Sequence, residues 1–326
     1  MKKICFVICY FGKLPDYYKI WKYSCSYNED VDFLVFTDNN IKSEYNNVKI
    51  VNLTLKELER CFSEKLNLDI RFENKPYKLC DFKPAYGLLF SEYLEEYDFW
   101  GHCDIDQVFG KIRKFITDDI LENYCKIQKW GHLTLYKNTK AINEMFKNDG
   151  AIYSYKTVFS TDENYAFDET TGINKIFEKN NIESYNKIKI ADIDRKYSRY
   201  KLDGDRNYNN QIFYWENGEI KRAYIDAGEV KVDEFCYLHF QKRNPKILMN
   251  VDSKKIESFY ITEKGFLNKK IGIPTQEEIK KIEPYISEKF EKKEKNKYIL
   301  RKIKDFMLCG YGQKKVWIKQ KTKGRK

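Results

Sequence analysis

Two aspartates at the end of an apolar run have the types and spacing that metal chemistry needs. The strand-like run Asp98–Cys103 is followed by Asp104 and Asp106, in the stretch FWGHCDIDQVFG. Side chains two residues apart on a strand point the same way, so both carboxylates can approach one cation. Two carboxylates and phosphate oxygens are natural ligands of Mg²⁺ and Mn²⁺. We therefore predict a Mn²⁺ or Mg²⁺ site at these two residues.

The Asp-x-Asp spacing is not specific by itself, because the sequence contains four such pairs. They lie at 30/32, 104/106, 192/194 and 203/205. Only the 104/106 pair follows a long apolar strand in the part of the chain where strands and helices alternate. In open parallel sheets, ligands bind beyond the carboxyl ends of the strands. We interpret the other three pairs as solvated acids in turns, which is also the alternative for Asp104 and Asp106.

The elements that would position this pair alternate between strands and helices. Apolar runs predict strands at 4–10, 31–38, 48–53 and 98–103. Helical periodicity predicts helices at 15–27, 55–66 and 86–97. Thr54 and Glu57 form a capping-box signature at the start of the second helix. This alternation predicts an α/β fold with a Rossmann-like, mostly parallel sheet flanked by helices.

The second half of the chain gives fewer signals. We predict a helix from Lys111, a strand within 131–138, a short helix at 139–147 and a strand within 234–243. The segment 151–210 is polar and aromatic, and we expect it to form loops and short helices that act as a variable lid.

The positive charge is concentrated at the C-terminal end. The net charge is +11, and residues 286–326 hold 15 Lys and Arg against 4 Asp and Glu, which accounts for all of it. We predict a basic amphipathic helix there that binds an anionic membrane surface, with Ile303, Phe306 and Trp317 at the interface. A solvated, poorly ordered tail is the alternative.

Cysteine usage and hydropathy predict the location. The nine cysteines include no C-x-x-C pair, and several lie in apolar runs, as expected of reduced, buried thiols. The sequence has no recognisable targeting segment and no apolar run of the ~18 residues that a membrane span needs. We expect a cytoplasmic protein, peripheral on the inner face of the cell membrane.

Two function classes are disfavoured. Residues 1–285 are electrically neutral and contain no recognisable nucleic-acid-binding module, so we expect no nucleic-acid partner. A nucleotidyl- or phosphotransferase could use similar metal–carboxylate chemistry, but the phosphate-binding signature G-x-x-x-x-G-K-[ST] is missing from the sequence.

Seven sequence blocks resemble a class of enzymes. In order they are YFGKLPDYY, FLVFTDN, PYKLCDFKPAYG, FWGHCDID, GHLTLYKN, FDE and YLHFQKR. Over about residues 1–245 the chain resembles metal-dependent glycosyltransferases of the A-type nucleotide-diphospho-sugar fold, and in particular a bacterial family of capsule- and polysaccharide-associated glycosyltransferase-like proteins. The resemblance implies transfer of a hexose from a nucleotide-diphosphate sugar, with UDP expected, to a cell-surface glycan or lipid-linked oligosaccharide.

The resemblance assigns roles around the metal. It implies that Asp106 is the primary metal ligand and that Asp104 lies near the metal or the donor ribose. It also implies that His239 completes the coordination, with Lys242 and Arg243 helping to neutralise the diphosphate. From its spacing alone, His239 is equally a hydrogen-bonded strand histidine, and that alternative stays open.

Donor recognition is expected at the ends of the early strands, where an aromatic ring or the backbone can stack on a nucleotide base. The candidates after the first two strands are Tyr10, Phe11, Gly12, Thr37 and Asp38. The resemblance adds a cluster before the Asp-x-Asp strand, formed by Lys78, Asp81 and Lys83. A surface salt-bridge set is the alternative for Lys78.

The acceptor side has three candidates. If the reaction inverts the anomeric configuration, Asp168 or Glu169 would deprotonate the acceptor hydroxyl, a contribution of about 10²–10⁴-fold in rate. If it retains configuration, the resemblance implies a front-face mechanism without such a base. Acids that begin a helix near Gly172 are the alternative. By resemblance, His132 borders the acceptor, whereas His102 is expected to be a core histidine.

The predicted organisation has three parts. They are a nucleotide-sugar-binding domain at 1–250, a connecting segment at 251–285 and the basic tail at 286–326. Since a fold alone does not establish turnover, a non-catalytic nucleotide-sugar binder is an alternative function. A membrane- or nucleic-acid-binding protein that acts through the tail is another.

Overall fold

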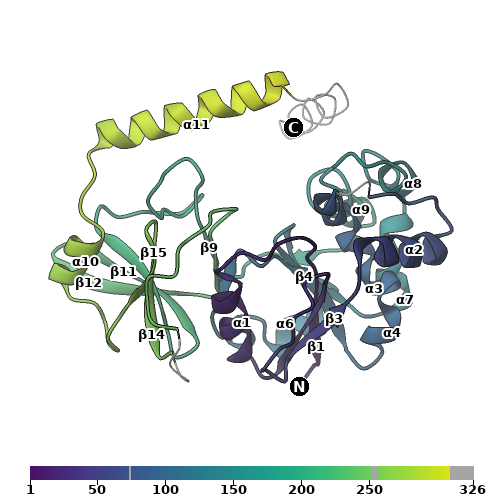
Figure 1. Ribbon diagram of the computed structural model, residues 1–326, viewed down its shortest axis with the longest axis horizontal. Helices are drawn as coiled ribbons and strands as arrows, with labels where there is room; N and C mark the ends of the chain where they lie inside the picture. Colours follow the sequence, from purple (N-terminus) through teal and green to yellow (C-terminus); the bar gives the residue numbers. More distant parts are fainter. Residues whose placement is uncertain (73–74, 252–255, 309–326) are drawn as a thin grey trace.

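The first sheet places the carboxyl ends of several buried strands at one edge. The computed structural model describes residues 1–72, 75–251 and 256–308, and these form a mixed α/β protein (Figure 1). Within these ranges, the largest sheet has seven strands in the order β3-β2-β1-β4-β7-β6-β8. Its parallel part consists of β1 (Ile4–Cys9), β2 (Val31–Thr37), β3 (Val48–Asn52) and β4 (Phe99–Cys103). The predicted mostly parallel sheet is therefore confirmed.

The apolar strand runs follow from burial on both faces. All residues of β4 are buried, and so are the first five of β1. Strands covered on both faces lose the alternation of polar and apolar residues. Helix α1 (Tyr18–Ser26) covers one face, where Trp21 packs edge-on against Phe33. The predicted strands at 4–10, 31–38, 48–53 and 98–103 all form, within one or two residues of the predicted bounds.

The antiparallel part of the sheet brings a later segment to the same edge. Strand β7 (Leu133–Lys137) runs antiparallel to β4, with Leu133 opposite Cys103. Consequently the residue before β7 lies beside the residue after β4, and the Asp104 amide donates to the His132 carbonyl over 3.0 Å. The sheet is completed by β6 (Lys126–Trp130) and β8 (Ser184–Tyr185).

The predicted helices are confirmed in part. Helix α2 (Leu55–Leu66) begins with the predicted capping box, since the Glu57 amide donates to Thr54 Oγ1 and the Thr54 amide to Glu57 Oε2. The predicted helix 86–97 forms as two short helices, α3 (Tyr86–Leu89) and α4 (Ser91–Leu94). Phe90 separates them with a non-helical backbone (φ −118°, ψ 25°), and its ring is buried against Phe36, with ring centroids 4.2 Å apart.

The middle of the chain contains short helices, as expected. They are η1 (Pro76–Ala85), α5 (Ile112–Phe115), α6 (Asp118–Asn123), α7 (Lys140–Asn143), η2 (Met145–Lys147), α8 (Tyr155–Phe159) and α9 (Ile173–Lys179). The predicted lid segment 151–210 contributes α8 and α9 to the core, where Phe159 and Phe177 are buried. The segment 151–210 therefore contributes to the core and does not consist of loops alone.

A second sheet extends the folded body beyond residue 250. Strands β10 (Gln211–Glu216), β11 (Glu219–Asp226) and β12 (Glu229–Phe235) form an antiparallel sheet with β14 (Ser258–Thr262) and β15 (Gly265–Asn268). Helix α10 (Gln276–Ile282) packs Ile279 into the same apolar cluster as Tyr214. The segment predicted to be a connection at 251–285 thus completes this sheet, and the predicted boundary at 250 falls inside it.

A small third sheet joins distant segments at the edge of the first. Strand β13 (Tyr237–His239) pairs antiparallel with β5 (Gln107–Phe109) and parallel with β9 (Ala191–Asp192). In this register His239 lies opposite both Gln107 and Asp192. The residues that follow the Asp-x-Asp motif are therefore held next to the late histidine.

The basic tail begins as a helix that lies outside both large sheets (Figure 1). Helix α11 (Glu288–Leu308) confirms a helical start to the predicted segment 286–326, and the remainder, with Trp317, lies outside the described residues. Ile303 is 45% exposed, whereas Phe306 is half-buried. Among the described helices, none is long and apolar enough to cross a membrane.

Candidate metal and nucleotide site

Two carboxylates and a histidine meet where β4 ends. Asp104 and Asp106 follow β4, and His239 ends β13. Each of the three offers a ligand atom, and these atoms all lie within 4.8 Å of one another. Asp106 Oδ1 is 3.4 Å from His239 Nε2. The side chains of Asp106 and His239 are 11% and 9% exposed, while the side chain of Asp104 is 37% exposed to solvent.

This donor set fits a divalent cation. Carboxylate oxygens suit Mg²⁺ and Mn²⁺, and an imidazole nitrogen extends the choice toward Mn²⁺ and other transition metals. Three protein ligands do not complete the coordination of such a cation, so further positions would remain for phosphate oxygens. The predicted set of Asp104, Asp106 and His239 is brought together as expected.

The cluster is electrostatically balanced as it stands. Burial alone would raise the pKa of Asp106, but the His239 imidazolium and the Lys242 amide, 2.5 Å from Asp106 Oδ2, hold it well below its usual range. Burial alone would lower the pKa of His239, but Asp106 and Asp192 raise it to about 10. A bound cation would take over the role of the imidazolium, and its binding to His239 would release a proton.

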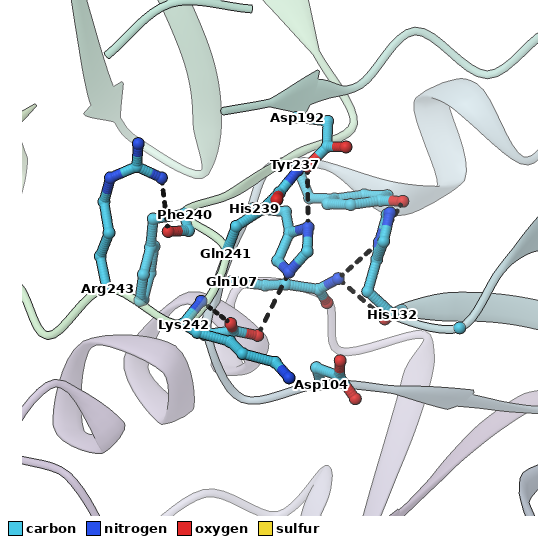
Figure 2. Close-up of polar contacts among 12 residues, drawn as sticks. Asp104, Gln107, His132, Asp192, Tyr237, His239, Phe240, Gln241, Lys242 and Arg243 are labelled. Atoms are coloured by element: carbon cyan, nitrogen blue, oxygen red, sulfur yellow. Dashed lines mark hydrogen bonds and ion pairs between the residues drawn. The ribbon is translucent and has the colours of Figure 1, made fainter. Parts of the chain in front are cut away.

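Asp192 orients His239, and this role of Asp192 was not predicted from the sequence. His239 Nδ1 lies 2.9 Å from Asp192 Oδ1 (Figure 2). This leaves Nε2 on the side of Asp106, 3.4 Å from its Oδ1. Gln241 Nε2 donates to Asp192 Oδ1 over 2.7 Å. Metal-binding histidines usually donate their other ring N–H to a carboxylate in this way. Asp192 belongs to a pair that we interpreted as solvated acids, and no local signal marks it, because its position depends on the β9–β13 pairing.

His132 lies against the same histidine. The two imidazole rings stack with their centroids 4.1 Å apart. His132 Nδ1 is 3.2 Å from both Gln107 Nε2 and the Tyr237 hydroxyl (Figure 2). Burial and the neighbouring His239 hold the pKa of His132 well below its usual range, so its ring is neutral. His132, Asp192 and His239 form a second group of ligand atoms within 4.8 Å.

Lys83 places a buried positive charge beside Asp104. Its Nζ donates to Asp104 Oδ1 and to the Gly131 carbonyl, each over 2.6 Å. It also lies 3.9 Å from Asp168 Oδ2. Burial opposes the charged form, but the Asp104 carboxylate holds the pKa of Lys83 well above its usual value. Lys83 is therefore an ammonium group beside the carboxylate–histidine cluster, and its donor role stays a prediction.

Two cavities meet at the cluster. The first has a volume of about 440 Å³ and is lined by apolar and aromatic residues that include Tyr10, Phe11, Tyr17, Pro76, Tyr77 and Tyr86. The second, of about 360 Å³, is lined by polar and aromatic residues that include Trp130, His132, Asp168, Glu169, Asp192 and His239. Asp104, Asp106, Lys83 and Lys242 line both cavities. The cluster therefore lies between an aromatic pocket and a polar one.

Gly12, Thr37 and Asp38, which were also predicted to bind the donor, do not line the first cavity. Gly12 has a φ of 92°, a left-handed conformation that favours glycine, and its amide donates to Asp38 Oδ1 over 2.9 Å. Asn39 Nδ2 donates to Thr37 Oγ1 over 2.8 Å. Of the five predicted residues, Tyr10 and Phe11 line the cavity, while Gly12, Thr37 and Asp38 shape the loops that support it.

Lys78 and Asp81 form a buried ion pair away from both cavities. Their side chains are 1% and 0% exposed, and Lys78 Nζ lies 2.8 Å from Asp81 Oδ2. Asp81 also accepts hydrogen bonds from the amides of Tyr165 and Phe167. Lys78 donates in addition to the Val158 carbonyl. This placement supports a structural role, in which the pair fastens the segment 158–167 to η1, and does not support the donor role predicted for them.

Asp168 and Glu169 both line the second cavity. Burial raises the pKa of Asp168 well above its usual value despite the nearby Lys83, so Asp168 holds a proton. Glu169 Oε1 accepts the Gly131 amide over 2.5 Å. A Cβ atom at residue 131 would lie 2.6 Å from Asp168 Oδ2 and 2.8 Å from Glu169 Oε1, so a larger residue there would displace these two side chains. Of the two predicted acids, Glu169 is the better placed to accept a proton.

The turn after β13 aims its backbone at the cluster. Gln241 and Lys242 have φ values of 47° and 60°, an unusual conformation that directs the Lys242 amide to Asp106. Lys242 Nζ donates to the Tyr77 hydroxyl over 2.7 Å. Arg243 instead donates to the carbonyls of Phe240, Asp194 and Tyr197. Lys242 is thus beside the site, whereas Arg243 braces the loop behind it.

His102 is a core residue, as expected. It lies within β4, is fully buried, and burial holds its pKa well below the usual range. It offers no atom to either of the ligand groups found among the described residues.

Fold and site together define a mixed α/β protein with a carboxylate–histidine cluster at the edge of a mostly parallel sheet. The chain belongs to DUF6625, a family of unknown function, whose match covers residues 6–270. That range includes every residue of the cluster and ends before α10 and α11. No curated protein matches the sequence.

Proposed function

We propose that the protein is a metal-dependent glycosyltransferase that moves a hexose from a nucleotide-diphosphate sugar, with UDP as the expected nucleotide, to a glycan or lipid-linked acceptor. The observation that carries the proposal is the position of the Asp104, Asp106 and His239 cluster between an aromatic cavity and a polar one. This is the arrangement that a donor, a cation and an acceptor would need. The resemblance of the seven sequence blocks points to the same chemistry.

The first cavity suits the nucleotide. A base can stack on the aromatic rings of Tyr10, Phe11 or Tyr77, which line it. A nucleotide seated there has its diphosphate at the cluster, where a bound Mn²⁺ or Mg²⁺ would neutralise the charge of the leaving group. Lys83 and Lys242 line the same opening and add positive charge on either side.

The second cavity suits the acceptor. Trp130 offers an aromatic face for a sugar ring, and Glu169 offers a carboxylate for an acceptor hydroxyl. Asp168, which holds a proton, and Lys83 are 3.9 Å apart at the boundary between the cavities. In an inverting reaction Glu169 would accept the proton, while Asp104 and the Gly131 carbonyl would keep Lys83 in place.

We include the membrane location in this proposal. The apolar residues Ile299, Leu300, Ile303 and Met307 are 44–68% exposed and share one face of α11. Lys292, Lys295 and Lys304 flank that face. A helix with an exposed apolar stripe and flanking lysines binds the surface of an anionic bilayer without crossing it.

Thermal melting with nucleotides and metal tests the proposed donor. We expect UDP with Mn²⁺ to raise the melting temperature, and neither UDP with EDTA nor GDP with Mn²⁺ to do so. Ligand at 100 times its dissociation constant stabilises the folded state by about 2.7 kcal/mol. A shift with GDP instead of UDP would change the nucleotide but keep the proposal. No shift with any nucleotide in Mn²⁺ would overturn it.

A further inference from the structure

A basic groove lies between α11 and the loops behind the metal cluster. Its volume is about 690 Å³, and its walls are the loops 195–198 and 241–243 on one side and α11 on the other. Eight of its fifteen lining residues are Lys or Arg, and two are acidic. Such a concentration of one charge over a concave surface attracts an anion.

One face of α11 supplies half of this positive charge. Lys293, Lys297 and Arg301 are four residues apart, so they lie on one side of the helix, and all three line the groove together with Lys302. The exposed apolar residues Ile299, Ile303 and Met307 lie on the opposite side. The helix therefore has a basic face toward the protein and an apolar face away from it.

Two acidic residues of α11, Glu291 and Glu294, contact the body of the protein, and among the groove cations Lys196 is paired with Asp194. Lys201 Nζ lies 2.6 Å from Glu291, and the Ser198 amide donates to Glu294 over 3.3 Å. Within the described part of the chain, by contrast, no ion pair is formed by Lys293, Lys297 or Arg301. Repulsion among these cations is relieved when an anion binds between them.

The groove adjoins the polar cavity at the carboxylate–histidine cluster. Arg195, Gln241 and Lys242 line both of them. Gln241 contacts Asp192, and the Lys242 amide contacts Asp106, so the shared wall is the turn that supports the cluster. A ligand held in the groove can therefore extend into the cavity where we place the acceptor.

We propose that this groove binds a diphosphate group carried by the acceptor, and so selects a diphosphate-bearing acceptor, either lipid-linked or soluble. That the bound molecule is an acceptor rests on the proposed function. That it carries a diphosphate rests on the groove alone. Two phosphates carry enough negative charge to engage Lys293, Lys297 and Arg301 together, and the planar Arg fork suits phosphate oxygens. Farther along the ligand, the acceptor hydroxyl reaches the second cavity beside Glu169.

Binding of diphosphates in EDTA tests the proposal, because the metal cluster is then unloaded. The probes are inorganic pyrophosphate, farnesyl diphosphate and farnesol, and binding is measured by fluorescence or calorimetry. The variant Lys297→Glu/Arg301→Glu reverses the charge of the groove face. Its matched control, Lys280→Glu/Lys281→Glu, makes the same change of charge on exposed residues of α10 that do not line the groove. Lys297→Ala/Arg301→Ala serves as a milder second variant.

We expect diphosphate binding in the wild type, a loss of at least tenfold in both groove variants, and a change of less than about twofold in the control variant. Equal binding of pyrophosphate and farnesyl diphosphate would indicate a soluble source, and tighter binding of farnesyl diphosphate a lipid-linked one. Absence of diphosphate binding, an equal loss in the control variant, or equal binding of farnesol and farnesyl diphosphate would overturn the proposal. Failure of the UDP and Mn²⁺ experiment alone would remove the donor but leave the diphosphate site.

Discussion

Replacing Asp106 with asparagine is expected to weaken the binding of UDP in the presence of Mn²⁺ by at least about 100-fold. The Asp106 carboxylate is 11% exposed, lies 3.4 Å from His239 Nε2 and accepts the Lys242 amide. Loss of a group that only supports a metal ligand already costs about 10–100-fold. The asparagine removes the negative charge of the ligand itself and keeps its shape. A 100-fold loss corresponds to about 2.8 kcal/mol in binding free energy.

Calorimetric titration of UDP into protein that contains Mn²⁺ measures this effect. Asp203→Asn is the matched control, because Asp203 belongs to another Asp-x-Asp pair and its side chain is 51% exposed. We expect the control to bind UDP like the wild type. Wild-type affinity in a folded Asp106→Asn variant would show that the cluster is not the metal site.

Replacing Asp81 with alanine is expected to lower the free energy of unfolding by about 3–5 kcal/mol. Removal of one partner from a buried ion pair leaves the other charge buried and uncompensated, which has costs of this size. Here the Lys78 ammonium, 1% exposed, would lose its carboxylate, and the amides of Tyr165 and Phe167 would lose their acceptor. The segment that leads to Asp168 would lose its attachment to η1.

Urea unfolding followed by circular dichroism measures this loss. Asp69→Ala is the control, since the carboxylate of Asp69 pairs with Arg71 at the surface and is 77% exposed. Exposed pairs contribute at most about 1 kcal/mol. A cost below about 1 kcal/mol for Asp81→Ala would contradict the structural role. A selective loss of UDP affinity without a loss of stability would instead restore the donor role predicted from the sequence.

The sheet and the position of the Asp-x-Asp motif could be predicted because both depend on local patterns. Continuous apolar runs mark strands that are covered on both faces, and the Thr54–Glu57 capping box marks the start of α2. Asp104 and Asp106 follow such a run directly, so their place at the strand end needed no knowledge of distant contacts. His239 was found with the help of the resemblance.

The support of the site could not be predicted, because it depends on distant pairing. Asp192 reaches His239 only through the β9–β13 register, across 47 residues of sequence. Lys78 and Asp81 were predicted to bind the donor, with a surface salt bridge as the alternative for Lys78. Their burial as a pair cannot be read from sequence spacing. The strands β14 and β15 follow a Lys-rich stretch, so composition did not separate them from a connecting segment.

The most direct test of the account is release of the nucleoside diphosphate from its sugar. Wild type and Asp106→Asn would be incubated with UDP-hexoses and GDP-hexoses, in Mn²⁺ or in EDTA, with a membrane lipid extract as the source of acceptors. We predict release from a UDP-hexose that requires Mn²⁺ and is lost in the variant. Release from no donor in Mn²⁺, from a protein that binds UDP, would contradict the proposed transfer and leave a nucleotide-sugar binder.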